Sequence, residues 1–430
     1  MIFSFILAAA VIILVSLVIK PAKVIYLKAL SIPAVCMLFI ICIVIFSKTA
    51  VKSALDGLVL WASIVVPSLF PFFAASELMN STGFTRAAGV LLEPVMRPFF
   101  NVPGCASFAL ALGVTSGYPV GAKITADLRK NGSLTKLEAE RLLAFTNNSG
   151  PLFIIGAVGT GMLGSASIGL FLFICHLLSC ITVGFIFRYY KRRMHGNKAT
   201  ILNGKNYPRK NTLHNFKSLL TAAGTKKFNF GELLGSAVRN SVSTILAIGG
   251  FIVLFSVIIN LLNETGIIGM VSGSISRLLK PLLPGMPLKE MISGIVGGLF
   301  EITTGSRLVS QGSSVPLTLK LPAVSFLIGW AGLSVHFQVM SIVSETDINI
   351  RPYLLGKLLQ GIIASIYTLL GIRFTSIASP AAEPTLSASA FDFHGFLSSL
   401  GSSILLLTTV TVIWLLFGLS GRRPKKKSSI

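Results

Sequence analysis

Charge is scarce in this sequence, and acidic charge is the scarcest of all. Charged residues make up 12% of the chain, and 14 of its 430 residues are Asp or Glu, whereas a soluble globular protein has about 25% charged residues. Mostly apolar runs long enough to cross a bilayer recur from one end to the other. A soluble globular protein is therefore excluded. The sequence predicts an all-α polytopic membrane protein with about nine to eleven transmembrane or re-entrant helices.

Motifs for catalysis, metal binding and nucleotide hydrolysis are also missing. The five cysteines lie in apolar segments without paired spacing, so they are expected to act as small hydrophobic residues rather than as disulfides or metal ligands. The sequence has no Walker motif and no nucleophile–base arrangement. We therefore expect no catalytic residues, no metal site, no cofactor and no enzymatic activity.

The basic residues are numerous but are placed at the ends of apolar segments. The net charge is +23, and eleven Lys or Arg with no Asp or Glu lie between Arg188 and Lys227. A second basic cluster runs from Arg422 to Lys427. Loops rich in Lys and Arg face the cytoplasm, so these clusters predict topology. The expected partner is a lipid bilayer and not a nucleic acid.

The chain carries a repeat of about 183 residues. Asn80–Phe84 (NSTGF) returns as Asn263–Ile267 (NETGI), and a proline follows each glycine fifteen residues later, at Pro98 and Pro281. A duplicated membrane unit with interrupted helices is typical of secondary transporters.

These features predict five segments along the chain. Placing the basic segments in the cytoplasm makes the two repeats inverted with respect to each other. The segments are two transmembrane helices (1–53), a first repeat (54–190), a basic cytoplasmic loop (191–232), a second repeat (233–374), and a polar loop, last transmembrane helix and basic tail (375–430).

A polar break is predicted in the first repeat at Gly117, Tyr118, Pro119 and Gly121. Pro119 lacks an amide hydrogen and clashes with the preceding helical turn, while the glycines permit unusual dihedral angles. Backbone groups freed at such a break can bind an ion or a charged substrate. The alternative is a hairpin bend or a glycine packing face.

The second repeat has Glu301, Thr303, Thr304 and Gly305 at the equivalent place. A carboxylate in an apolar segment costs about 2.5–3.5 kcal/mol on membrane-insertion scales, so Glu301 is a candidate to bind a coupling ion (H⁺ or Na⁺), to carry a proton or to orient Arg307. The alternative is a structural ion pair with that arginine.

Lys123 and Arg307 end the two motifs at matching positions. Two such cations would suit a substrate with two carboxylates. The alternative is that both side chains extend to a membrane interface.

A second break is predicted in each repeat. Asn147, Asn148 and Ser149 precede a proline in the first repeat, and Trp330 and His336 flank the counterpart in the second. Asparagine can bind a polar ligand, the indole can stack on a flat ring, and His336 can bind a carboxylate or carry a proton. Helix–helix hydrogen bonds are the alternative for each.

Three of these motifs together resemble one family. Ser116–Lys123, Asn147–Pro151 and Glu301–Gly305 are similar to the sporulation integral membrane protein family YlbJ, also called stage V sporulation protein V, over about residues 30–375. Each half also resembles the nucleoside-recognition gate domain. The resemblance implies a multi-pass protein of the bacterial cell membrane, on the mother-cell side in the outer forespore membrane, which moves dipicolinic acid during endospore formation.

Three functions remain open from the sequence. The first is a transporter of a small organic anion, with dipicolinate, a flat aromatic dianion, as substrate. The second is a nucleoside or nucleobase carrier. The third is a non-transporting membrane scaffold for spore cortex or envelope assembly. The chain could also form a homo-oligomer in any of them.

Overall fold

The computed structural model of the chain describes residues 25–82, 84–191, 221, 229–281 and 288–374, and every regular element within them is helical. Residues up to 370 belong to one compact unit, which is the unit described below. The predicted span before residue 25, most of the basic loop, and the last span with its tail lie outside the described residues.

Four helical segments are long and apolar enough to cross a membrane, namely Ala166–Phe187, Phe230–Glu264, Leu317–Val343 and Arg351–Arg373. The helices at Ile32–Ile45 and Ser47–Ser63 pass the same test as a pair bent by 100°. The prediction of an all-α polytopic membrane protein is confirmed.

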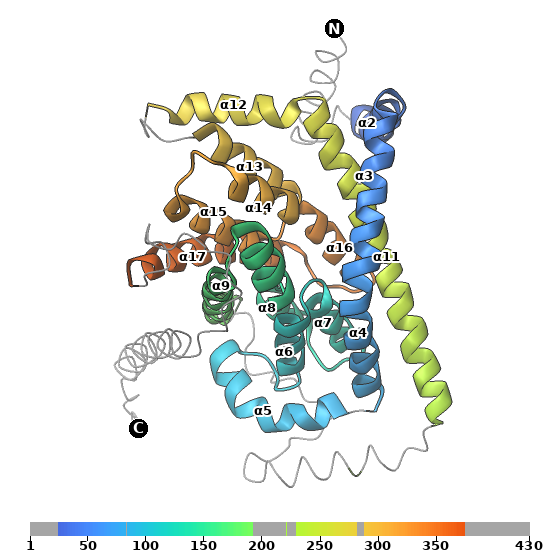
Figure 1. The fold of residues 1–430 in the computed structure, drawn as a ribbon. Helices are drawn as coiled ribbons and strands as arrows, with labels where there is room; N and C mark the ends of the chain where they lie inside the picture. The colour runs from blue at the N-terminus through green and yellow to red at the C-terminus, as the bar shows by residue number, and fades with distance from the viewer. Residues whose placement is uncertain (1–24, 83, 192–220, 222–228, 282–287, 375–430) are drawn as a thin grey trace, which may run out of the picture. The chain divides into compact units, whose positions relative to one another are not determined.

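The two halves of the chain contain the same elements in the same order (Figure 1). Each has a long leading helix, an amphipathic helix, two short helices joined by a break, a second broken pair, and a final long helix. In the first half, after α2 (Ile25–Ile45), these are α3 (Ser47–Leu60), η1 (Trp61–Val65) and α4 (Val66–Ser81), then α5 (Phe84–Phe100), α6 (Ala106–Ser116), α7 (Val120–Lys130), α8 (Lys136–Thr146), η2 (Leu152–Met162) and α9 (Ala166–Phe187). In the second half they are α11 (Phe230–Glu264), α12 (Ile267–Leu279), α13 (Leu288–Phe300), α14 (Ile302–Gln311), α15 (Leu317–Trp330), α16 (Leu333–Val343) and α17 (Arg351–Phe374).

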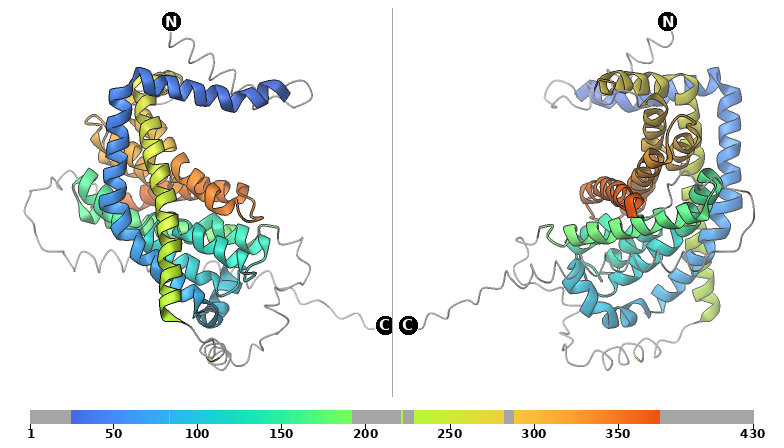
Figure 2. Two further views of the ribbon diagram at one scale, coloured as in Figure 1. Left: turned by 90° about the vertical axis from the view of Figure 1, so that its right-hand side faces the viewer. Right: turned by 60° about the vertical axis from the view of Figure 1, so that its left-hand side comes forward.

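The leading helices of the two halves pack side by side and run in opposite directions (Figures 1 and 2). The Trp61 indole nitrogen donates a hydrogen bond to the Ile245 carbonyl at 3.0 Å, and the Ser256 hydroxyl donates to the Ser53 carbonyl at 2.7 Å. The amphipathic helices α5 and α12 lie at opposite ends of this pair in Figure 1. An inverted pair of repeats requires both arrangements.

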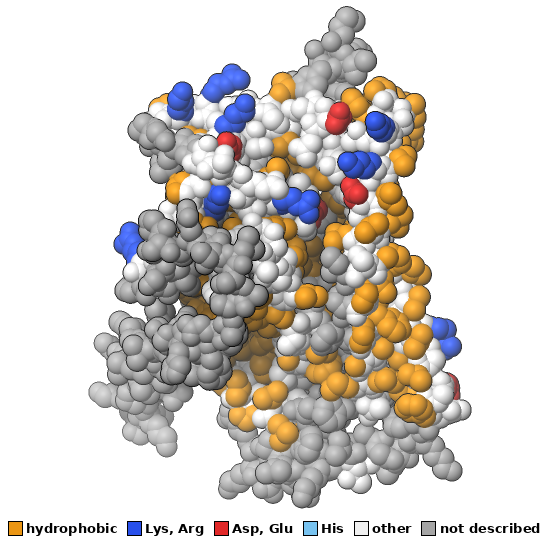
Figure 3. Space-filling view, viewed as in Figure 1, with side chains coloured by type: hydrophobic (Ala, Val, Ile, Leu, Met, Phe, Trp, Pro, Cys, Tyr) orange, Lys and Arg blue, Asp and Glu red, His pale blue; other side chains and the backbone are white. Residues whose placement is uncertain are grey.

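An apolar surface covers the outer side of these leading helices. Leu55 and Leu58 on α3 and Leu246 and Leu254 on α11 are exposed, and hydrophobic side chains gather along this side of the molecule at the right of Figure 3. Exposed apolar area of this extent is stable against lipid rather than water. The charged groups visible in Figure 3 lie mostly toward its upper end.

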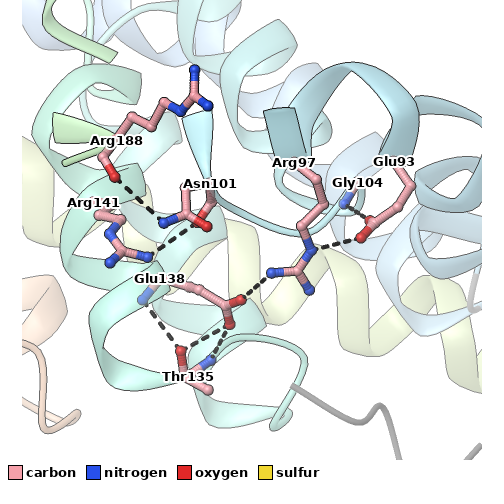
Figure 4. A network of polar contacts seen from close by, with 8 residues as sticks. All are labelled: Glu93, Arg97, Asn101, Gly104, Thr135, Glu138, Arg141 and Arg188. Atoms are coloured by element: carbon pink, nitrogen blue, oxygen red, sulfur yellow. Dashed lines mark hydrogen bonds and ion pairs between the residues drawn. The ribbon is translucent and has the colours of Figure 1, made fainter. Parts of the chain in front are cut away.

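A network of ion pairs anchors the amphipathic helix α5 to α8 (Figure 4). Arg97 donates to Glu93 at 2.7 Å and to Glu138 at 2.6 Å. Glu138 also forms a capping box with Thr135 at the start of α8, and Glu93 accepts a hydrogen bond from the Gly104 amide. Thus α5, the loop after it and the first turn of α8 are held together.

Replacing Arg97 with methionine should destabilise the folded chain. The substitution leaves Glu138, whose side chain is 5% exposed, without that guanidinium, and breaking such a pair costs about 3 kcal/mol. Thermal unfolding in detergent would measure the loss. Lys289→Met, at an exposed position on α13, is the matched control and should leave the unfolding temperature unchanged.

The two halves also meet in a pair of ion pairs outside the membrane-crossing helices. Arg129, at the end of α7, donates to both carboxylate oxygens of Asp347 at 2.8 and 3.0 Å. The neighbouring Lys130 pairs with Glu345. The hydrogen bonds from Arg129 lower the pKa of the Asp347 carboxyl below its ordinary value.

This lowered pKa gives a pH dependence with a definite sign. The Arg129–Asp347 pair stabilises the folded chain above the ordinary aspartate pKa of about 4, and its contribution is lost as the pH falls through the lowered pKa. Asp347→Asn should therefore reduce stability at neutral pH, by less than about 1 kcal/mol because Asp347 is exposed. Unfolding curves of wild type and variant should converge in acid; a constant difference would contradict the assignment.

Candidate functional site

The four predicted helix breaks come together in two pairs, one in each half. In the first half, Gly117 has φ +91° and approaches Gly150 so closely that a Cβ on Gly117 would lie 2.9 Å from the Gly150 nitrogen. The break between α6 and α7 therefore packs directly on the break between α8 and η2. Glycine is required at Gly117 both for this contact and for its positive φ.

The second half repeats the arrangement with different residues. Gly332, with φ +84°, approaches the backbone of Phe300, Glu301 and Ile302, so that the break between α15 and α16 packs on the break between α13 and α14. The Trp330 indole nitrogen donates to the Leu299 carbonyl across the same contact at 3.1 Å.

Glu301 forms the N-cap of α14. Its two carboxylate oxygens accept hydrogen bonds from the amides of Thr303 at 2.8 Å and Thr304 at 2.7 Å. A carboxylate at this position satisfies free amides and opposes the positive end of the helix dipole. Gly305, one turn on, lies against Gly298, where an added Cβ would be 2.1 Å from the Gly298 Cα.

Hydrogen bonds join the breaks of the two halves. The Tyr118 hydroxyl donates to the Ile328 carbonyl of α15 at 2.7 Å. The Asn147 amide donates to the Tyr353 hydroxyl at 3.2 Å, and that hydroxyl also lies 3.1 Å from the His336 Nδ1. The site is therefore assembled from both repeats.

Lys357 of α17 is fully buried at the centre of these contacts. Its ammonium donates to the Asn147 carbonyl at 3.0 Å and to the Gln360 side-chain oxygen at 2.8 Å, and it lies 5.4 Å from the centroid of the Tyr118 ring. The Gln360 amide in turn donates to the Asn148 side-chain oxygen at 2.8 Å. These hydrogen-bond partners are uncharged, and Lys357 forms no salt bridge with any acidic group among the described residues.

Several buried polar atoms around Lys357 have unused hydrogen-bonding capacity. Asn147 Oδ1, His176 Nδ1 and His336 Nε2 have no hydrogen-bond partner within the described part of the chain, and neither does the hydroxyl of Ser116, next to the first break. Buried polar groups are nearly always paired in proteins. The Ser116 hydroxyl and a ring N–H of either histidine could donate to an anion beside the Lys357 ammonium, whereas Asn147 Oδ1 can only accept a hydrogen bond.

Some of the site residues predicted from the sequence lie around Lys357, and others lie elsewhere in the structure. Besides Gly117, Tyr118, Asn147 and Asn148, the centre includes Trp330, whose ring contacts the His336 ring edge-on at 4.4 Å between centroids. Pro119 and Ser149 lie in the two breaks of the first half and are buried. Gly121 packs on the Thr146 carbonyl.

The two cations predicted to act as a pair have different surroundings. Lys123 donates to Asp127 at 3.0 Å and lies 3.9 Å from a carboxylate oxygen of Glu77. Arg307 is exposed on α14. Lys123 is thus already engaged by carboxylates, whereas the Lys357 ammonium contacts Asn147 and Tyr118 at the breaks of the first half.

Lys357, Gln360, Tyr353 and His176 are not among the site residues that the sequence predicts. All four lie in the final long helices α9 and α17 of the two halves. A lysine followed three residues later by glutamine within an apolar helix was a signal available in the sequence, because ionisable residues inside membrane helices are usually functional.

Two comparisons of the sequence with known proteins found matches. Residues 62–186 match the family model Gate, described as nucleoside recognition. The sporulation integral membrane protein YlbJ of Bacillus subtilis (strain 168) is 41% identical over 327 residues, which are 75% of this chain and 78% of that protein.

Solved structures of CNTnw were also found. One in an outward-facing state is 12% identical with a TM-score of 0.43 and covers 85% of this chain and 92% of its own. An inward-facing, substrate-bound one is 11% identical with a TM-score of 0.39 and covers 86% and 91%.

Proposed function

Because the chain belongs to the family of the sporulation integral membrane protein YlbJ, we propose that it is a membrane transporter of a small organic anion. Its first candidate substrate is dipicolinate, moved across the outer forespore membrane on the mother-cell side. The observation that carries this proposal is Lys357, a fully buried cation between the helix breaks of two repeats whose hydrogen-bond partners are uncharged.

The charge of Lys357 selects the class of substrate. An ion in a low-dielectric interior carries a desolvation cost that a counter-ion offsets, and a carboxylate is the counter-ion that hydrogen-bonds best to an ammonium group. The aromatic rings of Tyr118, Trp330 and Tyr353 border the same centre and offer faces and edges to a flat ring. Dipicolinate combines both features in one molecule.

Access to Lys357 requires movement, because its side chain is fully buried. The helix breaks provide the places where such movement is easiest, since backbone there is not held in a continuous helix. A buried site that opens alternately to the two sides is the general requirement for a secondary transporter.

The second candidate is a nucleoside or nucleobase carrier, which the nucleoside-recognition match over residues 62–186 favours. Uncharged substrates would use the amide, hydroxyl and imidazole groups of the site and would leave Lys357 without a counter-ion.

A non-transporting scaffold for spore-envelope assembly is the third candidate, and in it the breaks would serve packing alone.

Uptake by proteoliposomes that contain the purified full chain would test the proposal. Labelled dipicolinate should enter saturably and faster than labelled uridine, and unlabelled dipicolinate should compete. Faster uridine uptake would instead support the nucleoside carrier. Folded protein that moves neither compound would contradict both transport functions and favour the scaffold.

A further inference from the structure

A second polar cluster lies away from Lys357, where α4 meets α7. The Lys123 ammonium stands between two carboxylates, 3.0 Å from Asp127 and 3.9 Å from Glu77. The side chains of Glu77 and Asp127 are 17% and 19% exposed. One ammonium thus faces two carboxylates that are both largely removed from solvent.

One ammonium balances only one of the two carboxylates, and the neighbouring residues do not supply a second positive charge. Asn240 of α11, which faces Glu77, is uncharged. Asp127 is also influenced by Lys130 and Glu345, but these two form an ion pair with each other. Counting all five ionisable groups gives three carboxylates and two lysines, so the cluster has an excess of one negative charge when fully ionised.

A cavity of about 320 Å³ adjoins this cluster. Lys123 and Asp127 line it together with Asn240 of α11 and Gln338 of α16. Gln338 is 6% exposed, and its side chain forms no hydrogen bond with any residue that the structure describes. Its amide lines the cavity, which is many times larger than one water requires, so water there could satisfy it.

The lining of this cavity contains charged side chains as well as apolar ones such as Ala247 and Phe251 of α11. Lys130 and Glu345 line the cavity and are both exposed, and the Arg129–Asp347 pair is adjacent to them in the chain. Water that enters beside these exposed charged groups would reach the Asp127 carboxylate, which lines the same cavity.

We propose that Glu77 and Asp127, with Lys123 between them, form a proton-binding site that is reached by water through this cavity. The ammonium already occupies the place that a metal cation would take between the carboxylates. The excess negative charge is neutralised when one of the two carboxylates takes up a proton from water. Like-charged carboxylates that share a site separate in this way, one holding its proton more firmly than the other.

The position of the site suggests what the proton does. Lys123 lies in the first turn of α7, directly after the break that places Tyr118 against Lys357. Asp127 lies on α7 with Lys123, whereas Glu77 lies on α4. Protonation of Glu77 would therefore remove the ion pair between the two helices and weaken the contact of α7 with α4. Binding of the proton and opening of the break would then be linked, and this step of the inference depends on the proposed transport function.

Infrared difference spectroscopy on the purified full chain tests the site without any transport. Wild-type protein should show the carbonyl stretch of a protonated carboxyl group near neutral pH, and Glu77→Gln and Asp127→Asn should each lose it. Glu264→Gln, at an exposed position at the end of α11, should keep it. A wild-type spectrum without the band, or a band that survives in both variants, would overturn the proposal.

Transport measurements separate this proposal from the proposed function. If wild-type proteoliposomes take up dipicolinate, an inward proton gradient should alter the rate, and Glu77→Gln should abolish that response while uptake continues. An unchanged response in Glu77→Gln would overturn the coupling and leave anion transport standing. The expected infrared band in a protein that moves no solute would support the proton site and contradict the transporter. Gel filtration and helix content establish that each variant is folded, and Asp127→Asn serves if Glu77→Gln is not.

Discussion

Lys357→Met is expected to reduce dipicolinate uptake at low substrate concentration by about a hundredfold, because losing a buried charged hydrogen-bond partner costs roughly 2–5 kcal/mol of binding. Methionine has a similar length and no charge, so the side chain still fills its buried position. Removal of an uncompensated charge favours folding, while the Asn147 carbonyl and the Gln360 side-chain oxygen lose a donor. The variant should therefore still reach the membrane, and uptake should be measured at equal amounts of reconstituted protein.

Arg307→Ala is the matched control for Lys357→Met. Arg307 is exposed on α14, and uptake by this variant should stay close to the wild-type value. If uptake were instead lost in Arg307→Ala and kept in Lys357→Met, the anion would bind at the pair of cations predicted from the sequence, Lys123 and Arg307. Loss of uptake in both variants would place two cations on the path.

Gly121→Ala and Gly305→Ala are expected to prevent correct folding. A Cβ at Gly121 would lie 2.0 Å from the Thr146 carbonyl oxygen, and one at Gly305 would lie 2.1 Å from the Gly298 Cα. Both obstacles are backbone, so neither can move aside without displacing a helix. The cost should reach or exceed about 3 kcal/mol, the upper end of the range for overpacked cores. The yield of monodisperse protein and its unfolding temperature would show the effect.

Gly250→Ala provides the control with the opposite sign. Gly250 lies within α11, and a Cβ there would have no atom within 4 Å. Alanine favours helix over glycine by about 0.5–1 kcal/mol, so this variant should be slightly more stable than wild type. If Gly250→Ala and Gly121→Ala lowered the stability by similar amounts, close helix contacts at the breaks would not be the reason that glycine is needed at Gly121.

Much of the element order could be predicted because its signals are local. The proline and glycines at Gly117–Gly121 predicted a break, and the structure has one between α6 and α7. The repeat of about 183 residues correctly indicated that each element of the first half has a counterpart in the second. Such signals depend on a few neighbouring residues, which a sequence displays directly.

The composition of the site could not be predicted in the same way, because its contacts join distant parts of the chain. Lys357 meets Asn147, 210 residues away, and Gln360 meets Asn148 at a separation of 212. A single sequence contains no trace of such pairings. The contact between Lys123 and Asp127 could have been predicted from the sequence. The two residues are four apart, the spacing at which side chains meet on one face of a helix.

Three contacts in the structure share a property that follows from the duplication. Trp61 bonds to Ile245, His176 lies 3.5 Å from Gln360, and the Thr182 hydroxyl lies 2.8 Å from that of Tyr367, at sequence separations of 184, 184 and 185. These separations are within two residues of the repeat length, so each residue touches the other repeat at or next to its own counterpart. Equivalent points of two related bodies coincide only on the axis that relates them, so these pairs mark a pseudo-two-fold axis. A substitution near this axis changes one member of a pair of neighbouring, equivalent positions. His176 and Gln360 form such a pair, and their different chemistry shows how far the two halves have diverged.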